Sequence, residues 1–346
     1  MPLTTLPTPR VPDSLEAPPL RWGILGTGWI ADRFLTSLRG HTRQVVAAVG
    51  SRSQESADRA AAGWGVERAH GSYEALVADP GVDVVYVATP HNHHLPHALL
   101  AIAAGKHVLV EKPVGLDATE ARAIGEAAAA AGVFCMEAMW TLFLPKLDVV
   151  RQVMADGWLG EPRAVIADMG EWFDSDHRIM RADLAGGPLL DLGTYPVTLA
   201  TWALGAPDTV TAVATPAPTG INGQLSIALG TAAGATAALQ CSILTDTTEA
   251  ACIAGTDGRV DIGRFFYRPG PLSVHLRSGE SLHWDEPAVD HDALHFEAAE
   301  VARRIAAGET GSPWRPWADT VTALDVMDRV RAATGLDFEQ ARAARG

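Results

Sequence analysis

Short apolar runs rich in valine and isoleucine alternate with longer helical patterns along the first part of the chain. From Leu20 onward, four of these runs read LRWGILG, QVVAAVG, VDVVYVATP and KHVLVEKP. They are apolar throughout rather than alternating, which is typical of strands covered on both faces in a parallel sheet. The segments between them carry apolar side chains at helical spacing, namely Ile30, Phe34 and Leu38, and then Leu95, Leu99 and Ile102. Strands and helices in alternation predict a Rossmann domain of the α/β class, with a doubly wound parallel sheet.

The pattern changes after about Phe143. Strand-like runs then follow one another closely, among them RAVIADMGE, TVTAVATPA, LSIALGT, GATAALQCSIL, EACIAG and PLSVHL. Short connections that contain glycine predict a mostly antiparallel sheet. Helices are expected in DLGTYPVTLATWALG, from about His291 and from near Trp317. The helix from His291 has one apolar face, which consists of Leu294, Ala298, Val301 and Ile305.

These patterns divide the chain of 346 residues into three parts. The proline-rich stretch over residues 1–19 has no apolar core of the signal-peptide kind and is expected to be a flexible leader. A dinucleotide-binding Rossmann domain is expected over residues 20–143. An α+β domain with a large, mostly antiparallel open sheet is expected over residues 144–346.

The charge balance and the cysteines limit the possible partners and the compartment. A formal net charge of −14, from 27 basic and 41 acidic residues, argues against nucleic acid or an anionic membrane as the main partner. No apolar run approaches the ~20 residues that a membrane-spanning helix needs. Cys135, Cys241 and Cys252 match no metal-ligand spacing, and their odd number argues against a disulfide framework. A reduced, cytoplasmic protein is therefore expected.

The first predicted strand runs into a glycine-rich turn, GTGWIA, at the start of a predicted helix. Gly26 permits the tight turn, Gly28 lets the backbone approach a pyrophosphate, and Ala31 allows the helix to pack closely on the strand. The helix directs its unpaired N–H groups and the positive end of its dipole at the phosphates. Strand, turn and helix in this order satisfy the dinucleotide-binding pattern. The turn residues expected to contact the cofactor are Gly26, Thr27, Gly28, Trp29 and Ile30.

The end of the second strand bears on the choice between NADP and NAD. An acidic side chain there would pair with the ribose 2′-hydroxyl of NAD, but the sequence reads AVGSRS. Arg52 is expected instead to meet the 2′-phosphate of NADP, with Ser51 or Ser53 as a further donor. In the alternative interpretation, Arg52 is a solvated loop charge or stacks on adenine without discriminating. NADP is therefore favoured, and NAD is the alternative.

Polar residues follow the fourth predicted strand, at the sheet edge where ligands bind in open α/β folds. The run consists of Thr89, Pro90, His91, Asn92, His93 and His94. We expect it to line the cofactor and to cap the following helix. Its three histidines are not accompanied by a carboxylate or a cysteine at ligand spacing, so no metal site is predicted.

Candidate proton-transfer groups lie in two later segments. The fifth strand ends in Glu111 and Lys112, both expected near the nicotinamide, and a lysine at the edge of a buried strand is costly unless it is paired or used. Asp191 and Tyr195 are four residues apart, so on a helix they share one face. A phenol beside a carboxylate can transfer a proton, and a nearby ammonium lowers the phenol pKa from about 10. The structural alternatives are a surface lysine, a helix-capping aspartate and a core tyrosine.

Three segments together resemble the glucose–fructose oxidoreductase/inositol dehydrogenase (Gfo/Idh/MocA) family, namely GILGTGWIA, TPHNHHLPHALLAIAAGKHVLVEKP and GGPLLDLGTYPV. The resemblance implies a Rossmann domain followed by a substrate-binding domain on a large open sheet, which often forms dimer or tetramer contacts. It also implies that Lys112 matches the lysine of the family's EKP motif and that Asp191 matches the acidic residue of the later motif. Tyr195 stands where many members have histidine and where the dihydrodiol dehydrogenase and glucose–fructose branches have tyrosine.

The segment EAMW, from Glu137 to Trp140, is also similar to the dihydrodiol dehydrogenase branch. That branch commonly continues with threonine and arginine, whereas here Thr141 is followed by Leu142. The departure removes a charge near the domain junction and leaves the substrate of this chain open.

The residues and the resemblance together predict an enzyme that transfers a hydride between nicotinamide and a carbinol or carbonyl carbon of a sugar, polyol or cyclic diol. Tyr195 is expected to be the general acid and base, assisted by Lys112 and Asp191. The side chains expected either to shape the substrate cleft or to pack in the core are Trp140, Phe143, Trp172 and Arg178. A homo-oligomer, either a dimer or a tetramer, is expected, and a monomer whose helices cover the sheet is the alternative. The alternative function is a dinucleotide-binding sensor or regulatory protein without turnover.

Overall fold

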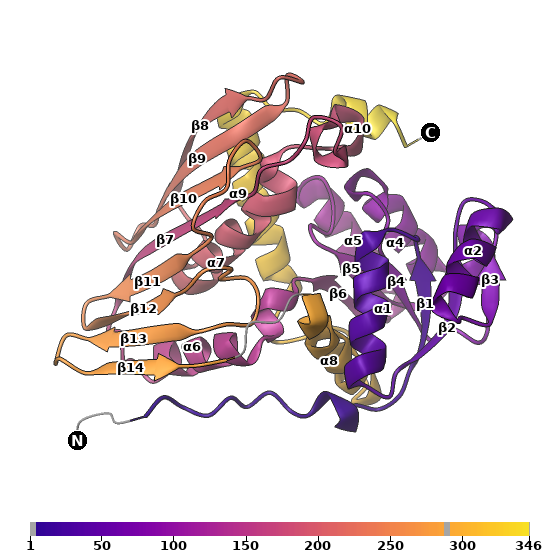
Figure 1. Ribbon diagram of the computed structural model, residues 1–346, viewed down its shortest axis with the longest axis horizontal. Helices are drawn as coiled ribbons and strands as arrows, with labels where there is room; N and C mark the ends of the chain where they lie inside the picture. The colour runs from indigo at the N-terminus through magenta and orange to yellow at the C-terminus, as the bar shows by residue number, and fades with distance from the viewer. Residues whose placement is uncertain (1–4, 287–290, 346) are drawn as a thin grey trace. The chain divides into compact units, whose positions relative to one another are not determined.

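The computed structural model describes residues 5–286 and 291–345. The chain divides into two compact units, each formed by segments that are distant in the sequence (Figure 1). The first, called the Rossmann unit here, contains Pro12–Phe143 and His291–Thr320. The second, called the sheet unit, contains Met1–Val11, Leu144–Asp290 and Val321–Gly346. The segment His291–Thr320 therefore belongs with the N-terminal part of the chain, whereas one domain was expected over residues 144–346.

The Rossmann unit is built on a six-stranded sheet with the order β3-β2-β1-β4-β5-β6. All of its strand pairs are parallel, which confirms the doubly wound sheet expected from the apolar runs. The strands are β1 (Arg21–Leu25), β2 (Val45–Gly50), β3 (Arg68–His70), β4 (Val84–Val87), β5 (His107–Glu111) and β6 (Cys135–Ala138). The strand order reverses between β1 and β4, and ligands bind at such a switch point, at the carboxyl ends of the strands.

The helices of the Rossmann unit are α1 (Trp29–His41), α2 (Gln54–Trp64), α3 (Tyr73–Val77), α4 (His94–Ala103), α5 (Ala118–Ala131) and α8 (His295–Ala306). Three of them begin at a side chain that accepts a backbone N–H of the first turn, supplied by Ser53, Ser72 and Asp117. The apolar face of α1 is buried as expected at Phe34 and Leu38. In α4, Ile102 is buried as expected, whereas Leu95 and Leu99 are only half-buried. The small side chains of Ala98 and Ala101 pack inward in their place.

Aromatic side chains fill the core between α1 and the sheet. The ring of Phe34 stacks on Tyr86 at 3.9 Å between centroids and lies 5.3 Å from Trp22. The two polar groups of these aromatics have partners: Trp22 Nε1 donates to Gln44 Oε1 at 2.9 Å, and the Tyr86 hydroxyl donates to the carboxylate of Glu111. The hydrogen bond of Tyr86 thus links the core to Glu111, the last residue of β5.

The C-terminal segment of the Rossmann unit is attached through a buried ion pair. Glu137, on β6, accepts hydrogen bonds at Oε2 from Arg315 Nε (2.9 Å), Arg315 Nη2 (2.5 Å) and the Thr320 hydroxyl (3.1 Å). Both charged side chains are only 2% exposed. The indole of Trp317 adds a bond to the carbonyl of Ala121 at 3.0 Å. These contacts explain why residues 291–320 belong to this unit.

Part of the expected leader is also ordered by contacts. Asp13 caps a 3-10 turn at Ser14–Glu16, and Arg303 donates to the carbonyl of Asp13 at 2.7 Å. Ala17 is fully buried against α8. In the sheet unit, the backbone N–H of Arg10 donates to Asp148 Oδ2 at 2.7 Å. The proline-rich start of the chain is therefore held in place by hydrogen bonds over much of its described length.

The sheet unit contains an eight-stranded sheet with the order β14-β13-β12-β11-β7-β10-β9-β8. Every pair is antiparallel except β7 with β10, which confirms the expected mostly antiparallel sheet. The strands are β7 (Pro162–Gly170), β8 (Thr209–Pro216), β9 (Asn222–Gly230), β10 (Thr236–Ser242), β11 (Ala251–Gly255), β12 (Gly258–Ile262), β13 (Leu272–Leu276) and β14 (Ser281–Trp284). The sequence runs had indicated six of these strands, and β12 and β14 were not among them.

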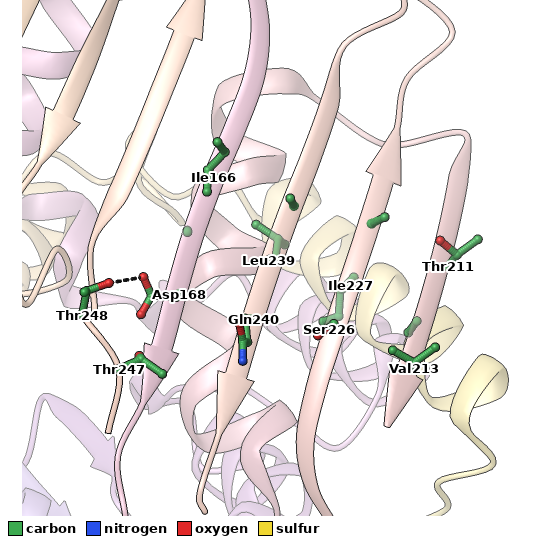
Figure 2. Close-up of a pocket in the computed structure, with 14 residues that line it drawn as sticks. Ile166, Asp168, Thr211, Val213, Ser226, Ile227, Leu239, Gln240, Thr247 and Thr248 are labelled. Carbon is green, nitrogen blue, oxygen red and sulfur yellow. Dashed lines mark hydrogen bonds between the residues drawn. The ribbon is translucent and has the colours of Figure 1, made fainter. Parts of the chain in front are cut away.

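One face of this sheet is covered and the other is open. The helices that end in this unit are α6 (Pro145–Ala155), α7 (Thr194–Leu204), α9 (Trp317–Thr334) and α10 (Glu339–Ala343). The helix α7 packs on β7 and β10. On the open face, Ile166 is 60% exposed and Val213 is 70% exposed, and they line one surface with Thr211, Ser226 and Gln240 (Figure 2).

Candidate functional site

The two glycines of the turn after β1 differ in backbone conformation and in the space beside them. Gly26 has φ +112°, and a Cβ at this position would lie 2.7 Å from the carbonyl oxygen of Ala88. Gly28 has φ −84°, and no atom lies within 4 Å of the position that its Cβ would take. Gly26 is therefore required by the fold itself. The space beside Gly28 is open, as a pyrophosphate approaching the backbone would need.

The helix α1 begins directly after this turn. Its N-cap is Gly28, which supplies no side-chain hydrogen bond to the first turn. The N–H groups at the start of a helix and the positive end of its dipole attract anions. The residue types and the geometry from Gly26 to Ile30 thus fit the diphosphate of a dinucleotide. Trp29, at the first helical position, is 57% exposed, with the Arg33 guanidinium 5.7 Å from its ring centroid.

The end of β2 carries a basic and aromatic cluster. Ser51 is buried and donates its N–H to the carbonyl of His70 at 3.1 Å, whereas Arg52 is exposed. Burial raises the pKa of Tyr73 and lowers that of His97 to about 4, and the charge of Arg52 lowers both. The rings of Tyr73 and His97 meet edge to face at 4.5 Å. Sequence reasoning missed Tyr73 and His97, since they lie on α3 and α4 and no local motif contains them.

The histidine run after β4 forms a 3-10 turn over His91–His93, followed by α4. The expected capping by its side chains is not what the structure shows, because the cap residue His93 makes no side-chain hydrogen bond to α4. His94 instead lies with Nε2 2.7 Å from the carbonyl of Thr89 and Nδ1 2.7 Å from the carbonyl of Pro113. Its ring therefore holds the loops after β4 and β5 together, and burial lowers its pKa to about 4.

Lys112 lies directly after β5 and precedes Pro113 through a cis peptide bond. Its backbone N–H donates to Glu111 Oε2 at 3.0 Å, and its side chain is partly exposed. Glu111 is buried, and burial raises the pKa of its carboxyl, while the Tyr86 hydroxyl and the charge of Lys112 oppose the shift. The ammonium of Lys112 is thus carried by a segment whose backbone is fixed on both sides of the residue.

A third carboxyl lies near this edge of the Rossmann unit. Glu297, on α8, is fully buried, and neither of its oxygens has a hydrogen-bond partner among the described residues. Burial, with the nearby charges of Glu111 and Glu137, raises its pKa well above the usual value. Sequence reasoning missed Glu297 because its helix lies far along the chain from Glu111 and Lys112, and no local pattern connects the two segments.

Asp191 and Tyr195 lie in the sheet unit, on a continuous helical segment. Residues Leu189–Gly193 form a π-helical turn that leads into α7, so the four-residue spacing crosses a change of helix type. Single π turns of this kind occur often at functional sites. Asp191 accepts a hydrogen bond from Arg178 Nη2 at 2.8 Å. Tyr195 is 6% exposed, and its ring lies 4.9 Å from that of Tyr267.

The four candidate substrate residues divide into two kinds. Trp140 and Phe143 are buried in the Rossmann unit, and Phe143 stacks on Trp314 at 6.2 Å between centroids. Trp172 and Arg178 lie in the sheet unit and line one surface hollow, beside Phe173 and His177. Since Arg178 also binds Asp191, the second kind is connected to a candidate catalytic residue.

The described residues contain no group of three or more side chains placed to hold a metal ion. No helix within residues 5–286 and 291–345 is long and apolar enough to cross a membrane.

Comparison with known proteins places this arrangement in a family. Residues 20–139 match the profile described as an oxidoreductase family with an NAD-binding Rossmann fold, and residues 148–261 match the GFO/IDH/MocA C-terminal domain. The chain is 36% identical over 336 residues to trans-1,2-dihydrobenzene-1,2-diol dehydrogenase of Mus musculus and 33% identical over 333 residues to that of Homo sapiens. Each match covers 93% of this chain and 98% of the relative.

Solved structures agree with this placement. A 3-ketoreductase from Actinomadura kijaniata, KijD10, in complex with NADP and TDP-benzene, is 29% identical with a TM-score of 0.80. The match covers 92% of this chain and 98% of that one. Levoglucosan dehydrogenase, in complex with NADH and levoglucosan, shares the fold at 18% identity and a TM-score of 0.83, over 92% of this chain and 98% of its own. The chain belongs to the Gfo/Idh/MocA family and is an NAD(P)-binding oxidoreductase.

The two glycines of the turn give a matched pair of variants. Gly26→Ala should lower the free energy of unfolding by about 2 kcal/mol or more, because it combines a positive φ with a clash against the Ala88 carbonyl. Gly28→Ala should change it by less than about 1 kcal/mol but weaken dinucleotide binding at least about tenfold. Urea unfolding and fluorescence titration measure the two effects. Wild-type affinity in Gly28→Ala would show that no phosphate approaches this residue.

Proposed function

We propose that this chain transfers a hydride between NADP(H) and a carbinol or carbonyl carbon of a sugar, polyol or cyclic diol. The observation that carries the proposal is Tyr195 at the start of α7, buried, and following a π turn whose Asp191 is bound by Arg178. A protein that only binds a dinucleotide needs no phenol and carboxylate held in this way. Family membership, dihydrodiol dehydrogenase relatives and a ketoreductase neighbour support the same chemistry.

The dinucleotide supplies or accepts the hydride when it is bound. The turn from Gly26 to Ile30 holds its diphosphate at the start of α1. The polar run after β4 and the segment Glu111-Lys112 would line the part of the site that holds the nicotinamide. His94 holds these two loops together through the carbonyls of Thr89 and Pro113. The protein thereby contributes position and electrostatics rather than redox chemistry of its own.

Tyr195 acts as the proton donor to the developing alkoxide in reduction, and as the proton acceptor in oxidation. Asp191, fixed by Arg178, orients the reacting hydroxyl and the phenol. To Lys112 we assign the positive charge that favours the ionised phenol in this reaction. Two structures of the Actinomadura ketoreductase carry a lysine-to-alanine and a tyrosine-to-phenylalanine replacement, the same residue types that we assign these roles.

NADP is the proposed cofactor on the basis of the residues after β2. The Arg52 guanidinium is exposed where the adenosine ribose is expected, and the segment Gly50–Ser53 contains no acidic residue. A guanidinium binds a phosphate through charge-assisted, bidentate hydrogen bonds. Tyr73 and His97 add ring surfaces beside it that can contact the adenine. The solved neighbours hold either NADP or NADH, so the proposal of NADP rests on the residues of this chain.

The open face of the eight-stranded sheet is the proposed contact in a homodimer or larger homo-oligomer. Ile166 and Val213 are exposed on this face, and Ala228 and Ala238 line the same apolar surface, which is of the kind that marks protein interfaces. Light scattering on the eluting protein should therefore give a multiple of the 36.5 kDa chain mass, and a monomer would refute this contact.

The thiols of Cys135, Cys241 and Cys252 are free, as in a protein of the reducing cytoplasm, where we place this chain.

The proton-donor role of Tyr195 predicts a specific loss. Tyr195→Phe should lower kcat by about 100-fold to 10,000-fold, because general acid–base catalysis contributes this much, while NADPH binding stays near wild type. Thr201→Val, which removes a hydroxyl that donates to the Val197 and Thr198 carbonyls of the same helix, is the control and should keep its turnover. Wild-type turnover in Tyr195→Phe would remove the assignment. Absence of turnover in the wild-type protein with intact NADPH binding would favour a sensor.

The cofactor assignment predicts a selective effect of Arg52. Arg52→Ala should weaken NADPH binding about tenfold to 100-fold and leave NADH binding nearly unchanged, since only NADPH has the 2′-phosphate. Arg59→Ala, an exposed arginine on α2 that pairs with Glu55, should change neither affinity. Fluorescence titrations with both dinucleotides measure this. Equal binding of NADPH and NADH by the wild-type protein would refute the 2′-phosphate site.

A further inference from the structure

A buried carboxylate in the sheet unit has no role in the chemistry proposed above. Glu249 lies just before β11 and is only 4% exposed. Its Oε2 has no hydrogen-bond partner among the residues that the structure describes. A buried polar atom without a partner costs stability, so it is retained where something else uses it.

The backbone holds Glu249 in a defined place. Its N–H donates to Asp168 Oδ2 at 2.8 Å, and its carbonyl accepts the N–H of Phe266 at 2.9 Å. Thr248 donates to the other oxygen of Asp168 at 2.6 Å, as Figure 2 shows. Glu249 has φ +53°, in the left-handed region that a glutamate seldom adopts. The hydrogen bonds on both sides of Glu249 keep it in this conformation, which fixes the origin of its side chain.

The neighbours of Glu249 connect it with the candidate catalytic tyrosine. Tyr267 is buried, and burial raises its pKa; the charge of Arg268 lowers it, and those of Glu249 and Tyr195 raise it further. The Tyr267 ring lies 4.9 Å from the ring of Tyr195 and 5.0 Å from the guanidinium of Arg268. Since the Glu249 carbonyl is bonded to Phe266, the residue before Tyr267, the backbone of Glu249 lies in the same part of the sheet unit as Tyr267, whose ring contacts both Tyr195 and Arg268.

We propose that Glu249, with Arg268, binds a second hydroxyl of the substrate, on the carbon next to the one that reacts at Tyr195. A carboxylate accepts the hydroxyl hydrogen and a guanidinium donates to the hydroxyl oxygen, so the pair matches both functions of an alcohol. A substrate without this hydroxyl leaves a buried carboxylate unpaired, which penalises it strongly. The site thus selects vicinal diols and polyols over mono-alcohols. This inference rests on the proposed hydride transfer.

The protonation of Glu249 makes this selection depend on pH. Burial and the charge of Glu171 raise the pKa of Glu249 to about 7; Arg268 and Arg264 oppose the shift, and Asp168 adds to it. The carboxyl is therefore protonated below about pH 7 and ionised above it. Since the ionised form is the stronger acceptor for a hydroxyl, KM for a diol should fall as pH rises from about 6 to 8.

The experiment compares the trans vicinal diol of cyclohexane with cyclohexanol as substrates of the full chain with NADP. Glu249→Gln, which keeps the size of the side chain, should raise KM for the diol about tenfold and leave KM for cyclohexanol unchanged. It should also abolish the fall of the diol KM with pH. The control is Glu161→Gln, which should behave as wild type. Glu161 is an exposed glutamate that directly precedes β7 and pairs with Arg163.

The outcomes separate the inference from the function on which it rests. If the wild-type protein oxidises the diol and Glu249→Gln keeps the wild-type diol-to-alcohol ratio, the inference is wrong while hydride transfer stands. If wild-type protein oxidises neither compound, nor any of a panel of sugars and polyols, the proposed function fails and the inference falls with it. Thermal unfolding shows whether each variant is folded. Glu249→Asp gives a second test, in which the KM for the diol should also rise.

Discussion

The buried Glu137 carboxylate is the interaction on which the arrangement of the Rossmann unit depends most. Its two oxygens join three distant segments, since Oε1 accepts the N–H of Val114 at 3.1 Å and Oε2 accepts bonds from Arg315 and Thr320. A buried charge of this kind is stable only while its partners remain, and loss of one partner typically costs about 3–5 kcal/mol. Because Val114 lies two residues after Lys112, the same carboxylate also fixes the path of the segment that carries the lysine.

The candidate site uses backbone geometry as much as side chains. A Cβ on Gly26 would clash with the carbonyl of Ala88, directly after β4, whereas the space beside Gly28 is open. In the sheet unit, the π turn before α7 and the left-handed conformation of Glu249 perform a similar task, because each sets the origin of a side chain to which we assign a role. Strained or unusual backbone is retained where the surrounding hydrogen bonds determine it, and it is concentrated at functional sites.

Much of the fold follows from patterns that are local in the sequence. Continuous apolar runs gave the parallel strands, and closely spaced runs gave the antiparallel sheet. Contacts between distant segments do not have such a pattern: Arg315 reaching Glu137, and Glu297 lying near Glu111, depend on where a C-terminal helix packs. Lys112, Asp191 and Tyr195 could be named as candidates from motifs, whereas no motif contains Tyr73, His97 or Glu249. Their chemistry comes from burial and neighbours, which only the folded chain defines.

Isotope transfer tests the central claim most directly. A panel of sugars, polyols and diols, deuterated at the carbinol carbons and including the trans vicinal diol of cyclohexane, is incubated with NADP and the purified protein. Our account predicts that the NADPH recovered with at least one member carries a single deuterium at nicotinamide C4, since the hydride comes from the carbinol carbon. NADPH without deuterium, or no NADPH from any member of the panel, would contradict it.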